Sequence, residues 1–267
     1  MALADFAAYK AALENSSDFT AFTIPTFTVV AGRISDSWTT QVPVGTAPTT
    51  AAAPTRTTAG ALEIQNGGAG VKGVVSARIN LLNPGMYLLC DRLSHQGGLV
   101  GNVTTSQTTN LATAALTRHT DGVGVMMGLS VYTQIGSTGS TVTVTYTDTA
   151  DASKTSPAIM IGGTGFREAG RMLVVPLASG GVGVKSVQSL IINTTSTGTA
   201  GAFGVTLFMP VAAIIADEQH AVAVCDLLSG RLAGGFDEVI DDACLFVACI
   251  SQGVSAAGAG GVILAEW

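Results

Sequence analysis

Polar and apolar residues alternate most strictly in Thr141–Thr147, where threonines are interleaved with Val142, Val144 and Tyr146. A period of two places these three side chains on one face, which predicts a half-buried antiparallel strand. Similar segments rich in Val, Ile, Thr and aromatic residues predict strands at Val123–Gln134, Ala158–Ile161, Met172–Leu177, Val184–Asn193 and Phe203–Met209, and a strand or an extended arm at Phe22–Val30. Short strands separated by Gly, Ser and Asp turns indicate a mainly β fold, an antiparallel β-sandwich or jelly roll.

The N-terminal part has a different pattern. Phe6, Tyr9 and Leu13 are spaced by three and four residues, which predicts a short helix at Asp5–Glu14 that must dock because it is marginal alone. The segment Ser35–Gly60 contains three prolines and almost no charge, and this composition excludes a helix or a central strand. It is either a flexible loop or an extended arm that lies across a neighbouring molecule.

The C-terminal pattern is mixed. Asp217–Leu232 is compatible with a helix, whereas Cys244–Ser251 and Gly261–Trp267 predict two strands paired across a Gly/Ala-rich turn.

Three parts are therefore expected along the chain. They are a short N-terminal helix with an extended Pro/Thr-rich arm (1–60), a β-sandwich or jelly-roll body (61–212), and a C-terminal α/β segment packing on that body (213–267). If the body supplies its own strands, deletion of 1–60 leaves a folded domain.

The composition excludes several classes of protein. Only 11% of the 267 residues are charged, the net charge is −6, and the mean hydropathy is +0.47. A nucleic-acid-binding protein would carry a basic surface, and a disordered chain would be polar and charged. The longest apolar run, Val205–Ala216, is shorter than the roughly 20 residues that span a bilayer, and the first residues lack the basic region of a signal peptide. We therefore expect synthesis in the cytoplasm, no secretion and no membrane partner.

So few charges leave much of the surface to Thr, Ser, Gly, Ala and aliphatic side chains. Such a surface favours a protein that is covered by neighbouring subunits, because isolated domains keep a more charged surface. A Thr/Ser-rich monomer is the alternative.

Two glycine-rich motifs resemble nucleotide-binding loops. Gly68–Gly73 matches GxGxxG and is followed by Asp91, but the helix that should come next is short and is halted by Asn83-Pro84-Gly85. Gly180–Ser186 lacks the glycine directly before Lys185 that a phosphate-binding loop requires. Neither motif predicts a cofactor site.

No set of residues forms a catalytic or metal-binding motif. Cys90, Cys225, Cys244 and Cys249 lie in apolar runs and predict buried thiols, and His95, His119 and His220 stand in no known motif. The polar groups Arg118–Gly122 and Phe166–Glu168 predict turns or salt bridges between subunits, and Asp237-Glu238 with Asp241-Asp242 a solvated helix face or interface rim. The sequence thus predicts no enzyme, no catalytic residue, no cofactor and no metal.

Several blocks resemble virion structural proteins of tailed bacteriophages. They are Leu88–Gly98 with the Thr-rich stretch after it, Thr141–Ala150, Gly162–Met172 and Ser196–Leu207, and the resemblance extends from Tyr87 to Pro210. It implies a head-associated protein of the capsid decoration or cement type, built as a β-sandwich or jelly roll and often trimeric. The implied partners are copies of itself and the major capsid protein or other virion proteins, with the virion as its location.

Two other functions stay open at this stage. A receptor- or glycan-binding module of a head or tail fibre would need exposed aromatic side chains, and the chain has only four Tyr and two Trp. A nucleotide-binding enzyme would depend on Gly68–Gly73.

Overall fold

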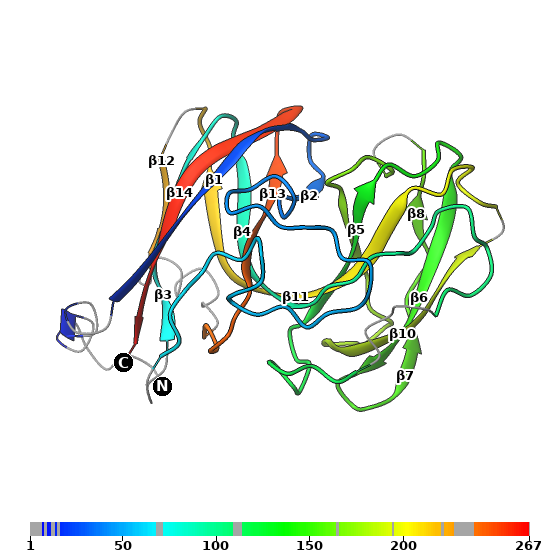
Figure 1. Cartoon of the computed structure of the whole chain (residues 1–267), viewed down its shortest axis with the longest axis horizontal. Helices are drawn as coiled ribbons and strands as arrows, with labels where there is room; N and C mark the ends of the chain where they lie inside the picture. Colours follow the sequence, from blue (N-terminus) through cyan, green and yellow to red (C-terminus); the bar gives the residue numbers. More distant parts are fainter. Residues whose placement is uncertain are drawn as a thin grey trace.

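The computed structural model shows a protein built from antiparallel sheets (Figure 1). It describes residues 17–67, 72–108, 114–163, 166–193, 195–219, 222–226 and 238–266, together with positions 7, 10, 11 and 14. The ordered secondary-structure elements, β1 to β14, are all strands, so the prediction of a mainly β, antiparallel protein is confirmed. No helix among the described residues has the length and apolar character needed to cross a membrane.

The first sheet joins the two ends of the described chain. Its strand order is β1 (Ser17–Thr28), β14 (Ser255–Glu266), β3 (Lys72–Leu81) and β12 (Val222–Asp226). Neighbouring glycines in β14 leave space on both faces of this sheet. The ring of Phe22 covers Gly260 and the ring of Phe19 covers Gly261, so that a Cβ at either glycine would lie within 3 Å of the ring. Aromatic side chains thus fill the gaps that glycine leaves in a strand.

The central sheet has six strands. Their order is β2 (Ile34–Asp36), β13 (Leu245–Ser251), β4 (Gly85–Ser94), β11 (Ala202–Ala216), β5 (Met126–Thr133) and β9 (Met172–Val175). The first and last strands approach each other, because Ser35 forms a bridge with Arg171 and the Asp36 amide donates to the Gly170 carbonyl at 2.8 Å. The central sheet is therefore nearly closed and barrel-like, with an inner and an outer face.

A third sheet, which we call the threonine sheet, packs at the other side of the molecule (Figure 1). It contains β10 (Val184–Asn193), β6 (Ser140–Asp148) and β7 (Ser153–Thr155), and β8 (Ile159–Ile161) also pairs with β6. Val142, Val144 and Tyr146 of β6 are fully buried, and the threonines between them are half-buried. The alternation in the sequence therefore predicted this strand and its buried face correctly.

The outer face of the central sheet contributes to two hydrophobic cores. Leu89 packs with Phe22 and other residues of the first sheet, whereas Leu129 packs with residues of the threonine sheet. Residues of opposite parity, such as Cys90 and Phe208, belong instead to a third cluster around Trp38, on the inner face. The central strands carry few charged residues because this layering buries them on both faces.

Most predicted strands are present, with shifted ends. β10 has the predicted bounds, whereas β11 continues well past Met209 and Pro210 to Ala216. The predicted pairing of the two C-terminal strands is wrong, because β13 lies in the central sheet and β14 in the first sheet. The Gly/Ala-rich stretch between them, expected to be a turn, is itself the first half of β14.

The helical predictions are not supported. Asp5–Glu14 lies mostly outside the described residues. Within Asp217–Leu232 the described residues Val222–Asp226 form strand β12 and not part of a helix, whereas residues 227–237 lie outside the described part. Backbone pairing with β3 selects the strand.

The three-part division of the chain stays a prediction, but the described contacts do not follow it. β1 pairs along its length with β14, and Trp38 is among the most buried side chains. β11 crosses the boundary expected at residue 212 without a break. In Figure 1 the blue segment after β2 crosses the middle of the molecule. Residues 17–60 therefore pack as part of the body, and neither the expected free loop nor an arm held only by a neighbour describes them.

Candidate functional site

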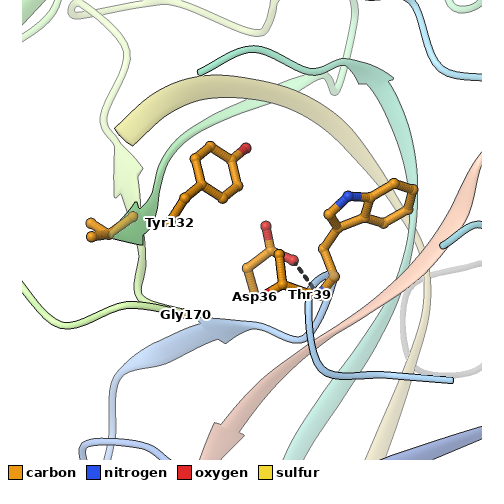
Figure 2. A pocket seen from close by; sticks show the side chains of 6 residues that line it. Asp36, Thr39, Tyr132 and Gly170 are labelled. Carbon is orange, nitrogen blue, oxygen red and sulfur yellow. Dashed lines mark hydrogen bonds between the residues drawn. The ribbon is translucent and has the colours of Figure 1, made fainter. Parts of the chain in front are cut away.

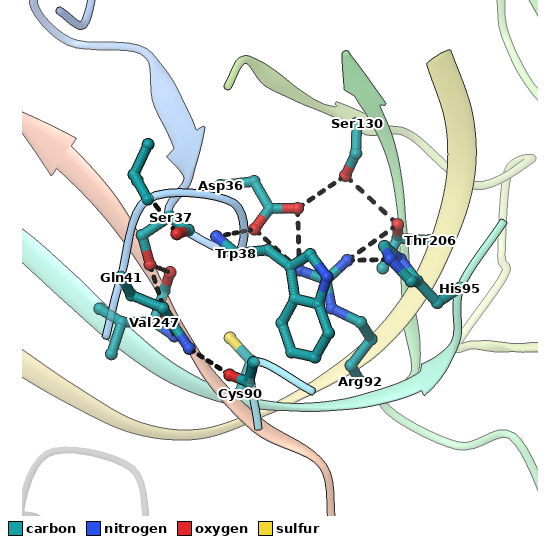
Figure 3. Close-up of polar contacts among 12 residues, drawn as sticks. Asp36, Ser37, Trp38, Gln41, Cys90, Arg92, His95, Ser130, Thr206 and Val247 are labelled. Carbon is teal, nitrogen blue, oxygen red and sulfur yellow. Dashed lines mark hydrogen bonds and ion pairs between the residues drawn. The ribbon is translucent and has the colours of Figure 1, made fainter. Parts of the chain in front are cut away.

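The inner face of the central sheet holds a buried ion pair (Figure 3). Arg92 of β4 has no exposed surface, and its Nη2 lies 2.7 and 2.8 Å from the two carboxylate oxygens of Asp36 at the end of β2. Asp36 also accepts hydrogen bonds from the Ser130 hydroxyl and the Trp38 amide, both at 3.0 Å. The negative charge therefore has donors on several sides, which is what a buried carboxylate requires.

Aromatic rings enclose the guanidinium group. Its carbon lies 3.9 Å from the centre of the Phe246 ring and 4.6 Å from that of Trp38. A cation that has been removed from water gains attraction from the faces of such rings. Thr206 lies at the other side, 3.2 Å from Nη1, and completes a polar interior in an otherwise apolar barrel-like sheet.

His95 lies next to this pair. Its Nδ1 is 2.9 Å from Nη1 of Arg92 and 3.1 Å from the Tyr132 hydroxyl. Because a guanidinium group only donates, Nδ1 must accept, which assigns the ring proton to Nε2. Burial, together with the positive charge of Arg92, lowers the pKa of His95 to about 2, so this imidazole is neutral at ordinary pH.

The residue before Arg92, Asp91, forms a second buried ion pair. Asp91 points to the other side of β4, where Nε and Nη2 of Arg118 each bind one of its oxygens at 2.9 Å. The Cys244 amide donates to the same carboxylate at 2.7 Å, and Arg118 also donates to the Pro54 carbonyl at 3.0 Å. Three segments distant in sequence are thereby joined at one carboxylate.

Residues Ser37–Leu62, which we call the strap, close one end of the central sheet. The side-chain amide of Gln41 donates to the Gly60 carbonyl at 2.6 Å and accepts from the Val247 amide at 3.2 Å. Trp38 stacks so closely on Gly45 that an added Cβ would lie 2.3 Å from its ring. The strap is therefore bound by specific polar contacts and close packing.

A small hollow lies beside the strap (Figure 2). It is lined by Asp36, Trp38, Thr39, Val131, Tyr132 and Gly170, and it has no room for a water-sized molecule. Its carboxylate is already bonded to Arg92. The hollow therefore offers no space or free charge for a small ligand, and the network around it holds the fold together.

The glycine motifs do not form nucleotide sites. Lys72 and Gly73 begin strand β3, whereas residues 68–71 lie outside the described part. A dinucleotide fold needs a helix at this point to direct amide groups at the phosphates. The second motif also leads into a strand, because Gly183 forms a bridge with Val123 and Val184 begins β10.

The cysteines and histidines are not brought together as a site. Cys90, Cys244 and Cys249 are buried and unpaired, which confirms the predicted thiols, and burial raises the pKa of Cys244 and Cys249 to about 12. Such thiols stay protonated and weakly reactive. Cys225 lies in β12 and His220 outside the described residues. Within the described ranges no three His, Cys, Asp or Glu residues are grouped to hold a metal ion.

The predicted polar groups have mostly local roles. Arg118 forms a buried salt bridge within its own chain, and Asp121 accepts from the Val123 amide in a turn. Asp241 and Asp242 lie in a loop and not on a helix, where Asp241 accepts from the Gly67 amide at 2.7 Å. Phe166 lies under the guanidinium of Arg33 at 4.4 Å, and Asp237 lies outside the described residues.

The surface carries large apolar side chains from many parts of the chain. More than a third exposed are Phe19, Val42, Val44, Val123, Met160, Val182, Ile191, Ile215 and Val254. The composition predicts an apolar surface but not which side chains it contains, because exposure depends on which face of each strand is covered.

Comparison with known proteins gives only distant similarity. No family model matches the chain, and no curated protein sequence matches it. Among solved structures, the VP2 protein of infectious bursal disease virus, as a D431N mutant in T=1 particles, is 8% identical over 94% of this chain and 77% of its own, with a TM-score of 0.20. The subviral particle of the same protein is 9% identical over 96% of this chain and 81% of its own, with a TM-score of 0.19. The chain is thus weakly similar to viral capsid proteins, at scores too low to establish a common fold.

Proposed function

We propose that the protein is a non-enzymatic structural subunit of a virion, of the capsid decoration or cement type. It binds copies of itself and the major capsid protein or other virion proteins. The observation that supports this role is the surface: large apolar side chains are exposed on all three sheets and their turns, while only 11% of all residues are charged. A surface with many exposed apolar side chains and few charges is favoured where neighbouring subunits cover it.

The rigid interior suits the same role. Two buried ion pairs and a bonded strap fix the shape of the body, so that few groups must be ordered when it binds. Each 1,000 Å² of apolar surface buried between subunits contributes on the order of 25 kcal/mol before ordering costs. Burial of this kind, and not chemistry at a site, is how a cement subunit would strengthen a shell.

The tailed-phage origin and the trimer belong to the same proposal and come from the sequence resemblance, whereas synthesis in the host cytoplasm is proposed because the first residues lack the basic region of a signal peptide. A fibre module that binds a receptor or glycan is the second candidate. It is less favoured because, among the described residues, Phe19 is the only aromatic side chain that is largely exposed. Sugar-binding grooves generally present several.

The proposal is tested by adding purified protein to particles that lack it. We expect it to co-sediment with shells in saturable amounts and to raise their resistance to heat, and to migrate alone as an oligomer in light scattering at tens of micromolar. A monomer that binds glycans and leaves shells unchanged would support the fibre module instead.

A further inference from the structure

One end of the central sheet is lined by apolar side chains. Ile215 of β11 pairs with Met86 of β4, Met86 with Ile250 of β13, and Ile250 with Ile34 of β2. Residues directly opposite in antiparallel strands point to the same side of the sheet. Four apolar side chains therefore form a row across four neighbouring strands, on the face that deeper in the sheet carries Cys90.

The two ends of the inner face differ. The strap closes one end with Trp38, which is only 1% exposed. At the other end Ile34, Met86 and Ile250 are only half-buried and Ile215 is 70% exposed. Leu88 and Met126 lie behind this row and are themselves only partly buried against the inner cluster. We call these six residues the apolar end. Neighbouring apolar side chains that keep solvent-accessible surface at the end of a sheet form a candidate interaction surface.

The chain itself contains a segment of matching chemistry. Residues Met1–Ser16 lie ahead of β1, and most of them are outside the described part. Phe6, Tyr9 and Leu13 repeat at spacings of three and four in this segment. That spacing places apolar side chains on one side of a helical turn, yet about ten residues are too few for a stable helix in water. The segment therefore needs an apolar surface to cover it.

Its own apolar end is out of reach. β1 pairs Ser17 with Ala265 at one end of the first sheet and Thr28 with Ser255 at the other. Its 12 residues span about 36 Å. The apolar end adjoins the Thr28 side, where the Gly32 amide donates to the Ser251 carbonyl, next to Ile250. Leu13 precedes Ser17 by only four residues, which reach at most about 14 Å.

We propose that the apolar end binds the N-terminal segment Met1–Ser16 of a second copy of this chain. The inference rests on the proposed assembly role and names the contact that joins the copies. The segment that binds and the surface that it binds are different parts of the chain. Each copy can therefore insert its N-terminal segment into one neighbour and accept the segment of another. Such a head-to-tail contact closes into a ring or continues as an open chain. A ring of this type accounts for a cyclic oligomer without a two-fold interface.

The test compares three variants of the full chain by sedimentation velocity. Deletion of residues 1–16 removes the donor, and Ile215→Lys places a charge in the acceptor. Met160→Lys is the control, because Met160 is 56% exposed on the threonine sheet, away from the apolar end. We expect the first two variants to sediment as monomers and the control to associate as the unchanged protein does. The proposal is overturned if the deletion variant or Ile215→Lys still associates. It is also overturned if the unchanged protein and the control both sediment as monomers.

A labelled peptide of residues 1–16 provides a direct measurement. It should bind the deletion variant in fluorescence anisotropy, and Ile215→Lys introduced into that variant should weaken binding at least tenfold, whereas Met160→Lys should leave it unchanged. Equal binding to all three proteins, or binding to none, contradicts the inference. Far-ultraviolet circular dichroism of each variant verifies that its β structure is intact. If these tests fail while the protein still binds shells, only this inference is wrong; if copies join but do not bind shells, the proposed function is wrong.

Discussion

Replacing Asp36 by Asn should destabilise the protein more than any change of a surface charge. The substitution keeps the size of the side chain but leaves Arg92, which has no exposed surface, without its counter-ion. It also weakens the hydrogen bonds that the carboxylate accepts from Ser130 and from the Trp38 amide. Removal of one partner from a buried ion pair typically costs about 3–5 kcal/mol.

Urea and thermal unfolding, followed by circular dichroism, measure this loss. For a chain of this size 3–5 kcal/mol lowers the unfolding temperature by roughly 10 °C. Asp151→Asn is the matched control, because Asp151 forms an ion pair with Lys185 at 2.9 Å but its side chain is 76% exposed. Asp151 has a φ of 60°, which Asn tolerates well, so the control should lose less than about 1 kcal/mol.

A double variant separates charge from packing. Asp36→Leu with Arg92→Met removes both charges, and apolar replacements of buried ion pairs are often neutral or stabilising. We expect it to recover part of the loss, because it restores neither the hydrogen bonds that Asp36 accepts from Ser130 and the Trp38 amide nor those that Arg92 forms with His95 and Thr206. The reasoning is refuted if Asp36→Asn is no less stable than the Asp151→Asn control.

Three further predictions concern the inner face and the strap. The pKa of His95 is about 2 in the folded protein, whereas its ordinary value is 6.5. Below pH 6.5 the unfolded chain therefore binds a proton at His95 that the folded protein does not bind. The contribution of His95 to stability is present above pH 6.5 and falls by about 1.4 kcal/mol per pH unit towards pH 2. Between pH 7 and pH 4.5, urea unfolding should therefore show that His95→Gln loses about 2–3 kcal/mol less stability than the unchanged protein. Equal losses would contradict the assignment. Gly45→Val should displace the Trp38 ring, since the new Cβ would lie 2.3 Å from it, and a red-shifted tryptophan emission is expected, whereas an unchanged spectrum argues against the packing described. Deletion of 1–60 should give an unfolded chain by circular dichroism, because β1 and Trp38 are lost; a cooperative melt would restore the view of residues 1–60 as a separable arm.

The sequence predicted the strands with strong local signals. Thr141–Thr147 alternates because only one face of β6 is buried, and period alone shows this. β14 was missed in its first half because Gly and Ala are typical of turns, and only the rings of Phe19 and Phe22 make them suitable for a strand. Those rings belong to β1, which lies more than two hundred residues away in the chain.

The buried polar network could not be predicted from local pattern. Asp36 and Arg92 are 56 residues apart, and the sequence around either residue contains no signal that identifies the other as its partner. One local signal was available: Asp91 and Arg92 follow the apolar run Met86–Cys90 within a strand, where adjacent charges point to opposite faces and each needs its own partner. The identity of those partners depends on how distant strands meet.

Cryo-electron microscopy of the parent virus particle tests the central claim most directly. The account predicts density for this β body at symmetry-related positions on the shell, with its apolar surfaces covered by neighbouring copies and capsid subunits. Purified particles that contain no such density, or in which the chain occurs only as a fibre tip without contact to the shell, would contradict it.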